Sequence, residues 1–195
     1  MKVFIVYCHP YAGSFTRSVL DSFTEGLDAA GHEYVISDLY AMNFSTDMTI
    51  DEYLRETNYA ENMPVPSDVA AEQQKLQESD AVVFVYPVFW TEAPAKLVGW
   101  FDRVWTVGFA YGEKPAMKRL KKALCLVCAG KTMQRLEECG EIEAMERVML
   151  GDRIHDRAEH KEMIIFDGIT KAAPEQCEVL TPMHLSRAYC AGRDF

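Results

Sequence analysis

Five short apolar runs recur along the chain, and amphipathic stretches separate them. Near-continuous apolar runs are typical of strands buried on both faces of a parallel sheet. The pattern predicts strands at Lys2–Tyr7, Glu33–Leu39, Ala81–Tyr86, Lys121–Ala129 and Glu162–Phe166. Apolar residues repeat every three or four positions between these strands, which predicts helices at 15–30, 67–78, 94–105 and 132–150. Strands that alternate with helices indicate a parallel sheet covered by helices.

The remaining segments are less regular. Residues 40–66 hold one weak helical piece near Ile50–Glu56, and we interpret them as an excursion within one domain that spans residues 1–195. The tail Ala172–Phe195 is predicted to be short and irregular, covering a sheet edge or reaching a partner subunit. We therefore expect an α/β fold with a doubly wound five-stranded parallel sheet in the order 2-1-3-4-5. In such a sheet the ligand crevice lies between the first and third strands.

Composition fits one packed core, since 49% of the 195 residues are hydrophobic. No apolar run approaches the ~18 residues of a membrane span, and the first residues lack a signal-peptide pattern, so we expect a cytoplasmic protein. A cytoplasmic location keeps thiols reduced. Cys125 and Cys128 form a C-x-x-C within a predicted strand, where this spacing puts them on opposite faces. This favours core packing over redox or metal chemistry.

The formal net charge is −10, from 30 acidic and 20 basic residues. Such a surface repels nucleic acid and anionic lipid. An anionic cofactor would therefore need local backbone donors to hold it.

Three predicted loops meet at the carboxyl edge of the sheet, where open α/β folds bind ligands. The first runs from His9 to Arg17 into a helix start, where amides and hydroxyls of Ser14, Phe15 and Thr16 offer an anion site. A plain capped helix fits the same residues equally well. His9 could bind a phosphate or ribityl hydroxyl, or serve only as a structural hydrogen-bonding residue.

The second loop contains Pro87, Val88, Phe89, Trp90 and Thr91, and combines backbone amides with an aromatic face suited to a flat heteroaromatic ring. The alternative is an aromatic cap over the end of the sheet.

The third loop contains Ala129 and Gly130, whose small size lets a ligand approach the backbone closely. An ordinary strand-to-helix turn is the alternative.

Side chains for direct catalysis are not evident in the sequence. It contains neither G-x-x-x-x-G-K-[ST] nor G-x-G-x-x-G, and no carboxylate pair or Cys–His or Ser–His–Asp arrangement stands out. His155 and His160 lack metal-ligand partners at a recognisable spacing, so no metal site is assigned. This pattern suits a protein whose bound cofactor performs the chemistry, and no catalytic residue is assigned.

Four segments resemble one protein family in order and spacing. They are H-x-x-x-x-S-F-T at His9–Thr16, S-D-L-Y-A-M-N-F at Ser37–Phe44, Y-P-V-F-W at Tyr86–Trp90, and P-A-K-L-V-G-W-F-D-R-V at Pro94–Val104 followed by G-F-A-Y. The chain resembles the flavodoxin-like NAD(P)H:quinone oxidoreductases, the group of DT-diaphorase and bacterial NAD(P)H dehydrogenases (quinone). The resemblance implies a flavodoxin-like fold, a homodimer with its sites at the interface, and hydride transfer from NAD(P)H through flavin N5 to a quinone or similar acceptor.

The resemblance also implies roles for the three loops. The first would hold the flavin phosphate through His9, Ser14, Phe15 and Thr16, and the second would lie along the isoalloxazine ring from Pro87 to Thr91. Ala129 and Gly130 would complete the ring site.

The chain departs from the family after the fourth strand, where C-A-G-K replaces T-T-G-G and the Tyr and His that assist hydride transfer have no clear equivalents. FMN is favoured over FAD as the cofactor. Lys131 and Arg135 are candidates to recognise a 2′-phosphate, or they are solvated residues at a helix start. Two other functions remain open: a flavin-binding regulatory subunit of a transporter, and a flavodoxin-type electron carrier.

Overall fold

The computed structural model describes all 195 residues. Five parallel strands form one sheet in the order β2-β1-β3-β4-β5, as predicted. The strands are β1 (Lys2–Tyr7), β2 (Glu33–Asp38), β3 (Ala81–Pro87), β4 (Leu120–Cys128) and β5 (Ala158–Phe166). Pro87 pairs with Cys128, and Cys128 pairs with Phe166, so β3, β4 and β5 end at one edge.

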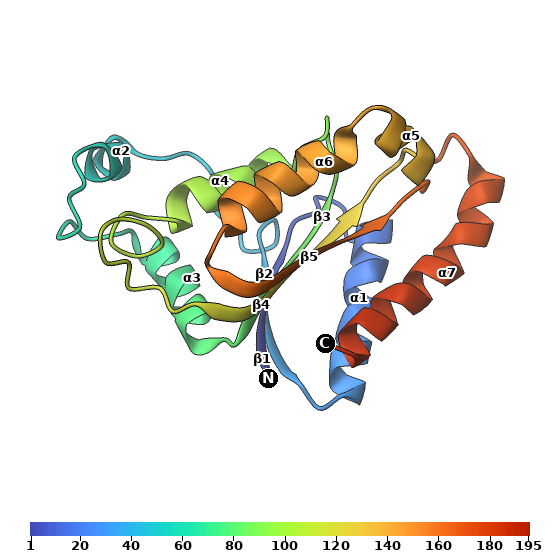
Figure 1. Cartoon of the computed structure of the whole chain (residues 1–195), viewed down its shortest axis with the longest axis horizontal. Helices are drawn as coiled ribbons and strands as arrows, with labels where there is room; N and C mark the ends of the chain where they lie inside the picture. The colour runs from blue at the N-terminus through green and yellow to red at the C-terminus, as the bar shows by residue number, and fades with distance from the viewer.

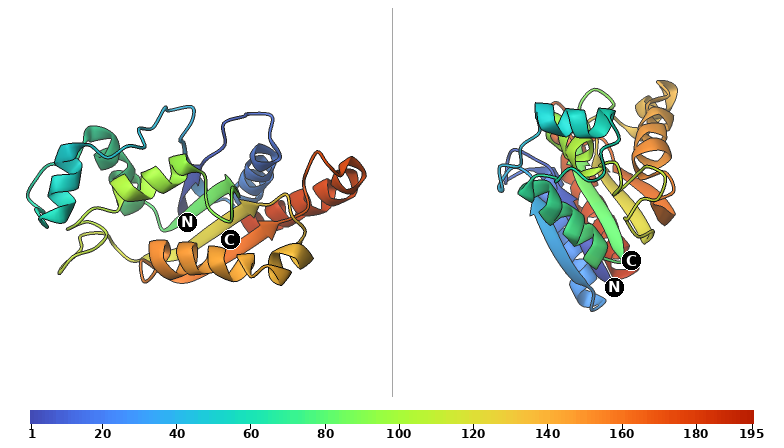
Figure 2. Two further views of the ribbon diagram at one scale, coloured as in Figure 1. Left: turned by 90° about the horizontal axis from the view of Figure 1, so that it is seen from above. Right: turned by 90° about the vertical axis from the view of Figure 1, so that its left-hand side faces the viewer.

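Helices cover both faces of the sheet (Figures 1 and 2). They are α1 (Phe15–Ala29), α2 (Ile50–Thr57), α3 (Ser67–Glu78), α4 (Ala95–Val104), α5 (Met133–Glu138), α6 (Glu141–Glu146), the π-helix η1 (Arg147–Ile154) and α7 (Pro174–Arg193). Successive strand side chains point to opposite faces. Phe84 accordingly packs with Trp100 of α4, while the neighbouring Val85 belongs to the core cluster on the other face, which includes Phe23 of α1. The result is a doubly wound, three-layer arrangement.

The predicted helix at 132–150 is interrupted. α5 ends at Glu138, and Gly140 has a left-handed φ of 66° that separates it from α6. The chain then continues as η1, in which the turns are wider than in an α-helix. Apolar residues keep a helical spacing on both sides of this break, and for this reason the sequence predicts a single helix.

The prediction of an irregular tail is wrong. Residues 174–193 form α7, a 20-residue helix that packs along α1 (Figure 1). Pro174 occupies the first helical turn, where its missing N–H is harmless, but Pro182 lies inside the helix, where proline usually disfavours helical structure. Tertiary contact with α1 overrides this local signal.

Two glycines set the distance between α1 and α7. A Cβ atom on Gly26 would lie 2.1 Å from the Tyr189 carbonyl oxygen, and one on Gly192 would lie 2.1 Å from the Phe23 carbonyl oxygen. Neither position can hold a larger residue unless the helices separate. α7 is therefore held by close approach of its backbone to that of α1, and it lacks the stripe of large apolar residues by which a helix is recognised in a sequence.

Helix α2 has reversed polarity, with charged side chains inward and apolar ones outward. The capping box between Thr49 and Glu52 starts the helix. Glu52 is buried against Arg103 of α4, with 2.8 Å between the carboxylate Oε1 and the guanidinium Nε. Ile50 and Tyr53 are instead 77% and 57% exposed. An ionic network thus holds α2, and its apolar face is left on the surface.

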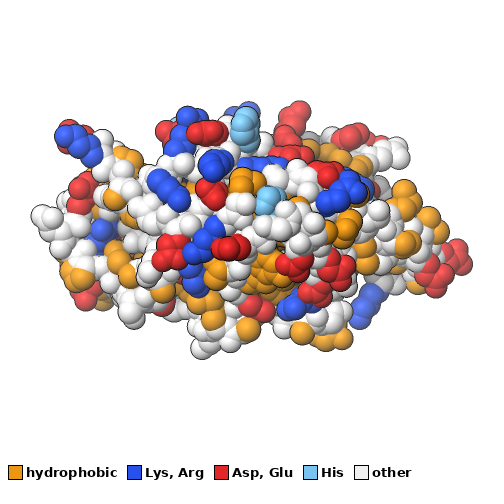
Figure 3. Space-filling model, turned by 90° about the horizontal axis from the view of Figure 1, so that it is seen from below, with side chains coloured by type: hydrophobic (Ala, Val, Ile, Leu, Met, Phe, Trp, Pro, Cys, Tyr) orange, Lys and Arg blue, Asp and Glu red, His pale blue; other side chains and the backbone are white.

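On the face shown in Figure 3, acidic and basic side chains are interspersed and do not gather into a basic patch. None of the helices is both long enough and apolar enough to cross a bilayer.

Candidate functional site

A cavity of about 390 Å³ and another of about 380 Å³ are among the hollows of the surface, and only the second lies at the carboxyl edge of the sheet. Its walls come from the loops after β3, β4 and β5 and from helices α5 and α6. The lining residues are Val88, Trp90, Thr91, Ala129, Gly130, Lys131, Leu136, Glu141 and Thr170. The cavity lies at the carboxyl edge that the rule for open α/β sheets indicates, but beyond β3, β4 and β5 rather than in the predicted crevice between the first and third strands.

The loop after β3 contains a tight two-residue hairpin turn. Phe89 and Glu92 exchange backbone hydrogen bonds of 2.9 and 3.0 Å across it. Trp90 and Thr91 between them have φ angles of 54° and 65°, so both are left-handed as in a type I′ turn. Asn and Gly normally fill such positions, and each left-handed L-residue costs about 1–2 kcal/mol. The turn is therefore strained, as is common where the backbone serves a ligand.

The strained turn leaves two donors free. The amides of Trp90 and Thr91 have no acceptor within the protein, and the Trp90 side chain is 99% exposed. Both residues line the cavity. The turn thus brings two unpaired N–H groups and a large exposed aromatic side chain to the wall of the cavity.

The opposite wall comes from the loop after β4. Ala129 is fixed by its amide, which donates to the Phe166 carbonyl at 2.9 Å, whereas the Gly130 amide has no protein acceptor. Lys131 forms an ion pair with Glu141, so its charge is neutralised within the cavity wall. Arg135 is paired with Glu138 on the surface at 3.2 Å. Neither cation is free to read a phosphate in this conformation.

The first predicted loop does not line this cavity. Ser14 caps α1, with its Oγ accepting from the Arg17 amide at 3.1 Å, and Thr16 is buried. The amides of Phe15 and Thr16 have no acceptor within the protein. The start of α1 is therefore a capped helix that also retains two free donors, and the anion site there stays a prediction.

His9 is turned toward its own loop. Its Nδ1 atom accepts from the Tyr11 amide at 3.0 Å, and its Nε2 atom has no protein partner. Burial lowers the pKa of His9, opposed by its contact with the Tyr11 backbone. The ring therefore stays neutral to lower pH than a free histidine, and Nε2 is left available to a ligand.

The C-x-x-C pair belongs to the core, as predicted. Cys125 packs on the α4 side of the sheet and Cys128 on the α1 side, and both are free thiols. Burial raises the pKa of each to about 12, so neither is a thiolate at neutral pH.

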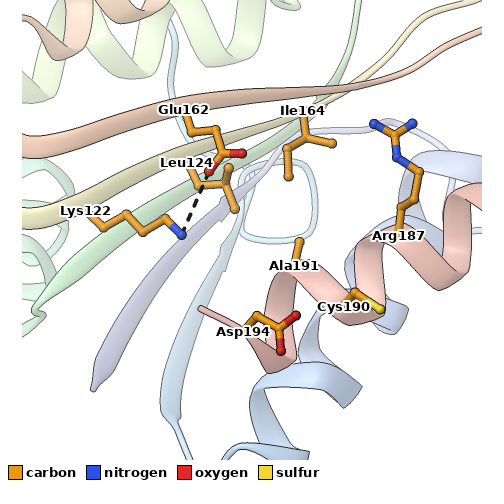
Figure 4. A pocket seen from close by; sticks show the side chains of 8 residues that line it. All are labelled: Lys122, Leu124, Glu162, Ile164, Arg187, Cys190, Ala191 and Asp194. Carbon is orange, nitrogen blue, oxygen red and sulfur yellow. Dashed lines mark ion pairs between the residues drawn. The ribbon is translucent and has the colours of Figure 1, made fainter.

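The 390 Å³ hollow lies elsewhere, beside the middle of β4 and β5 (Figure 4). Leu124 and Ile164 form its floor on the sheet, and α7 forms the facing wall. Its cations are already engaged: Lys122 lies 4.0 Å from Glu162, and Arg187 donates to the Ile165 carbonyl. It offers no converging free donors, in contrast to the cavity at the carboxyl edge.

Five of the predicted site residues line the edge cavity: Val88, Trp90, Thr91, Ala129 and Gly130. Pro87 is the buried last residue of β3, and Phe89 begins the turn without lining the cavity. Leu136, Glu141 and Thr170 were missed. The loop after β5 begins at the same edge of the sheet as the loops after β3 and β4, and this position in the predicted strand order could have identified Thr170.

The Flavodoxin-like fold family matches residues 1–152 of the chain. NAD(P)H dehydrogenase [quinone] 1 of Rattus norvegicus is 37% identical over 123 residues, which cover 56% of this chain and 45% of that protein. Ribosyldihydronicotinamide dehydrogenase [quinone] of Pongo abelii is 35% identical over 156 residues, covering 71% and 68%. The chain thus matches between about half and two thirds of the length of these curated relatives.

One solved structure resembles the chain over its whole length. The NAD(P)H:quinone oxidoreductase from Methanothermobacter marburgensis superposes with a TM-score of 0.94 at 42% identity, covering 100% of this chain and 96% of that one. Sheet order, edge cavity and these similarities together define a flavodoxin-like protein. Within that class, the chain belongs to the flavodoxin-like NAD(P)H:quinone oxidoreductase family.

Proposed function

We propose that the protein is a flavin-dependent NAD(P)H oxidoreductase that reduces a quinone or a similar small acceptor. The observation that carries the proposal is the edge cavity of about 380 Å³, which is lined by Trp90, Thr91 and Gly130, three residues whose amides have no acceptor within the protein. The membership of the family and the likeness to the Methanothermobacter marburgensis enzyme support it.

The chemistry of the cavity suits a flat ring with polar edges. Val88 and Leu136 supply apolar surface, while the backbone amides supply donors at fixed positions. A bound flavin would supply the redox chemistry, taking a hydride from NAD(P)H and passing both electrons to the acceptor. The protein's part is to orient the ring, and the exposed Trp90 provides an aromatic surface next to it.

We propose FMN as the form of the flavin. The start of α1 offers two free amides, those of Phe15 and Thr16, and the Nε2 atom of His9. This is a donor set for one phosphate, and the helix dipole of α1 favours its charge. The flavin released by heating the protein and separated by chromatography distinguishes FMN from FAD.

A homodimer is the assembly that we propose. The outward face of α2 carries three apolar residues at positions i, i+3 and i+4, namely Ile50, Tyr53 and Leu54. All three are exposed, and an exposed cluster of large apolar side chains is typical of a protein–protein interface. Tyr53→Glu should give a monomer in sedimentation experiments. Val179→Glu, at another exposed apolar position on α7, is the control and should stay dimeric. A monomeric wild-type protein contradicts the proposal.

The function is tested with purified protein and its visible spectrum. Flavin bands that bleach on anaerobic addition of NADH or NADPH and return on addition of a quinone support the proposal. A bound flavin that neither nucleotide reduces indicates an electron carrier or a regulatory subunit instead. Protein that binds neither FMN nor FAD refutes the flavin assignment.

A further inference from the structure

The strained turn at residues 89–92 is held by an ion pair from a distant part of the chain. The Glu92 carboxylate accepts from the Arg153 guanidinium, with 2.8 Å between Oε1 and Nη1 and 3.4 Å between Oε2 and Nη2. The same Oε1 accepts from the Ala93 amide at 2.7 Å. Glu92 therefore links the end of the turn to η1 through both of its oxygens.

Arg153 is itself fixed on several sides. Its side chain is 14% exposed, and its guanidinium lies 5.2 Å from the centroid of the Phe101 ring on α4. The Met149 sulfur accepts from Nη1 at 3.3 Å. The carbonyl of Arg153 accepts from the Trp105 indole at 2.6 Å. A planar guanidinium locked in this way is a rigid, directional support for a carboxylate.

We propose that Arg153 and Glu92 are positioning residues, which keep the Trp90 and Thr91 amides in the left-handed conformation that receives the cofactor ring. The inference rests on the proposed function, because it names the part of the chain that shapes the same cavity. A turn of this type made from Trp and Thr is unfavourable by itself. The ion pair supplies the long-range contact that the local sequence lacks.

Apoprotein and variants are titrated with FMN, and the dissociation constant is read from the change in flavin fluorescence. We expect Arg153→Met and Glu92→Gln each to weaken binding by about tenfold. The double variant should be no weaker than the worse single variant, since both changes remove one interaction.

Two further variants separate positioning from general stability. Arg187→Met removes a guanidinium that lies 5.5 Å from the centroid of the Phe166 ring and contacts neither the turn nor Arg153, so FMN affinity should stay within about twofold of wild type. Thr91→Gly adopts a left-handed φ freely. Added to Glu92→Gln, it should restore the affinity of Thr91→Gly alone, because the turn then no longer needs the ion pair.

The outcomes separate this inference from the function itself. If the wild-type protein does not bind flavin, the proposed function fails. If it binds, and Arg153→Met and Glu92→Gln bind equally well, the positioning role is refuted. Equal losses in Arg187→Met and Arg153→Met, or additive losses in the double variant, refute it as well. Glu92→Gln keeps the test valid should Arg153→Met fail to fold, since Glu92 is 41% exposed.

Discussion

Substitution of Gly26 by Ala should destabilise the protein, although helix propensity alone predicts the reverse. The added Cβ atom would lie 2.1 Å from the Tyr189 carbonyl oxygen and 2.7 Å from the Arg193 amide, both of which are backbone atoms that cannot rotate away. α1 and α7 must separate, and overpacking of this kind costs about 3 kcal/mol. The better helix propensity of Ala returns about 1 kcal/mol. The expected net loss is about 2 kcal/mol, which lowers the melting temperature of a domain of this size by about 4–8 °C.

Urea unfolding followed by circular dichroism measures this loss, with Gly151→Ala as the matched control. Gly151 lies in η1, where an added Cβ atom would meet no atom closer than 3.8 Å, so the stability should not fall measurably. A Gly26→Ala variant as stable as wild type, or more stable, would show that the two helices do not meet as closely as the glycines indicate.

Two other expectations follow from the ionisable groups. The Arg103 guanidinium lowers the pKa of the Asp68 carboxyl by hydrogen bonding to it. The pair therefore stabilises the fold at pH values above the ordinary pKa of an aspartate, and this stabilisation is lost as the pH falls through the lowered pKa of Asp68. Asp68→Asn should therefore lower the free energy of unfolding by about 1 kcal/mol near pH 7, and the difference from wild type should shrink below about pH 4. Urea unfolding at several pH values measures it. In thiol labelling of the native protein, exposed Cys139 should react at once, whereas Cys125 and Cys128 should react only on unfolding, because burial raises the pKa of both to about 12. Rapid labelling of either buried thiol would contradict their place in the core.

The strands and their order could be predicted because buried parallel strands leave an unbroken apolar signal, such as that of Ala81–Pro87, which is buried throughout. α7 could not, because its contact with α1 depends on small residues that carry no hydrophobic period. The rule that ligands sit at the carboxyl edge indicated the edge at which the cavity lies, although the cavity is beyond β3, β4 and β5 and not between the first and third strands. Its turn geometry was not predictable, since Trp90 and Thr91 are poor residues for a left-handed turn and their support, Arg153, lies about sixty positions away in sequence.

Two of the places where the chain departs from local preferences, the turn at 89–92 and helix α2, are joined by helix α4. The strained turn leads directly into α4, and Phe101 of α4 lies beneath the guanidinium that supports the turn. Arg103, two residues further on, holds the buried charge of α2, so that the apolar residues of α2 face outward. Natural sequences depart from local preferences mainly where function requires it. The exposed amides of the cavity and the outward face of α2 thus share one rigid support, and this helix sets both the site and the surface that we propose for dimerisation.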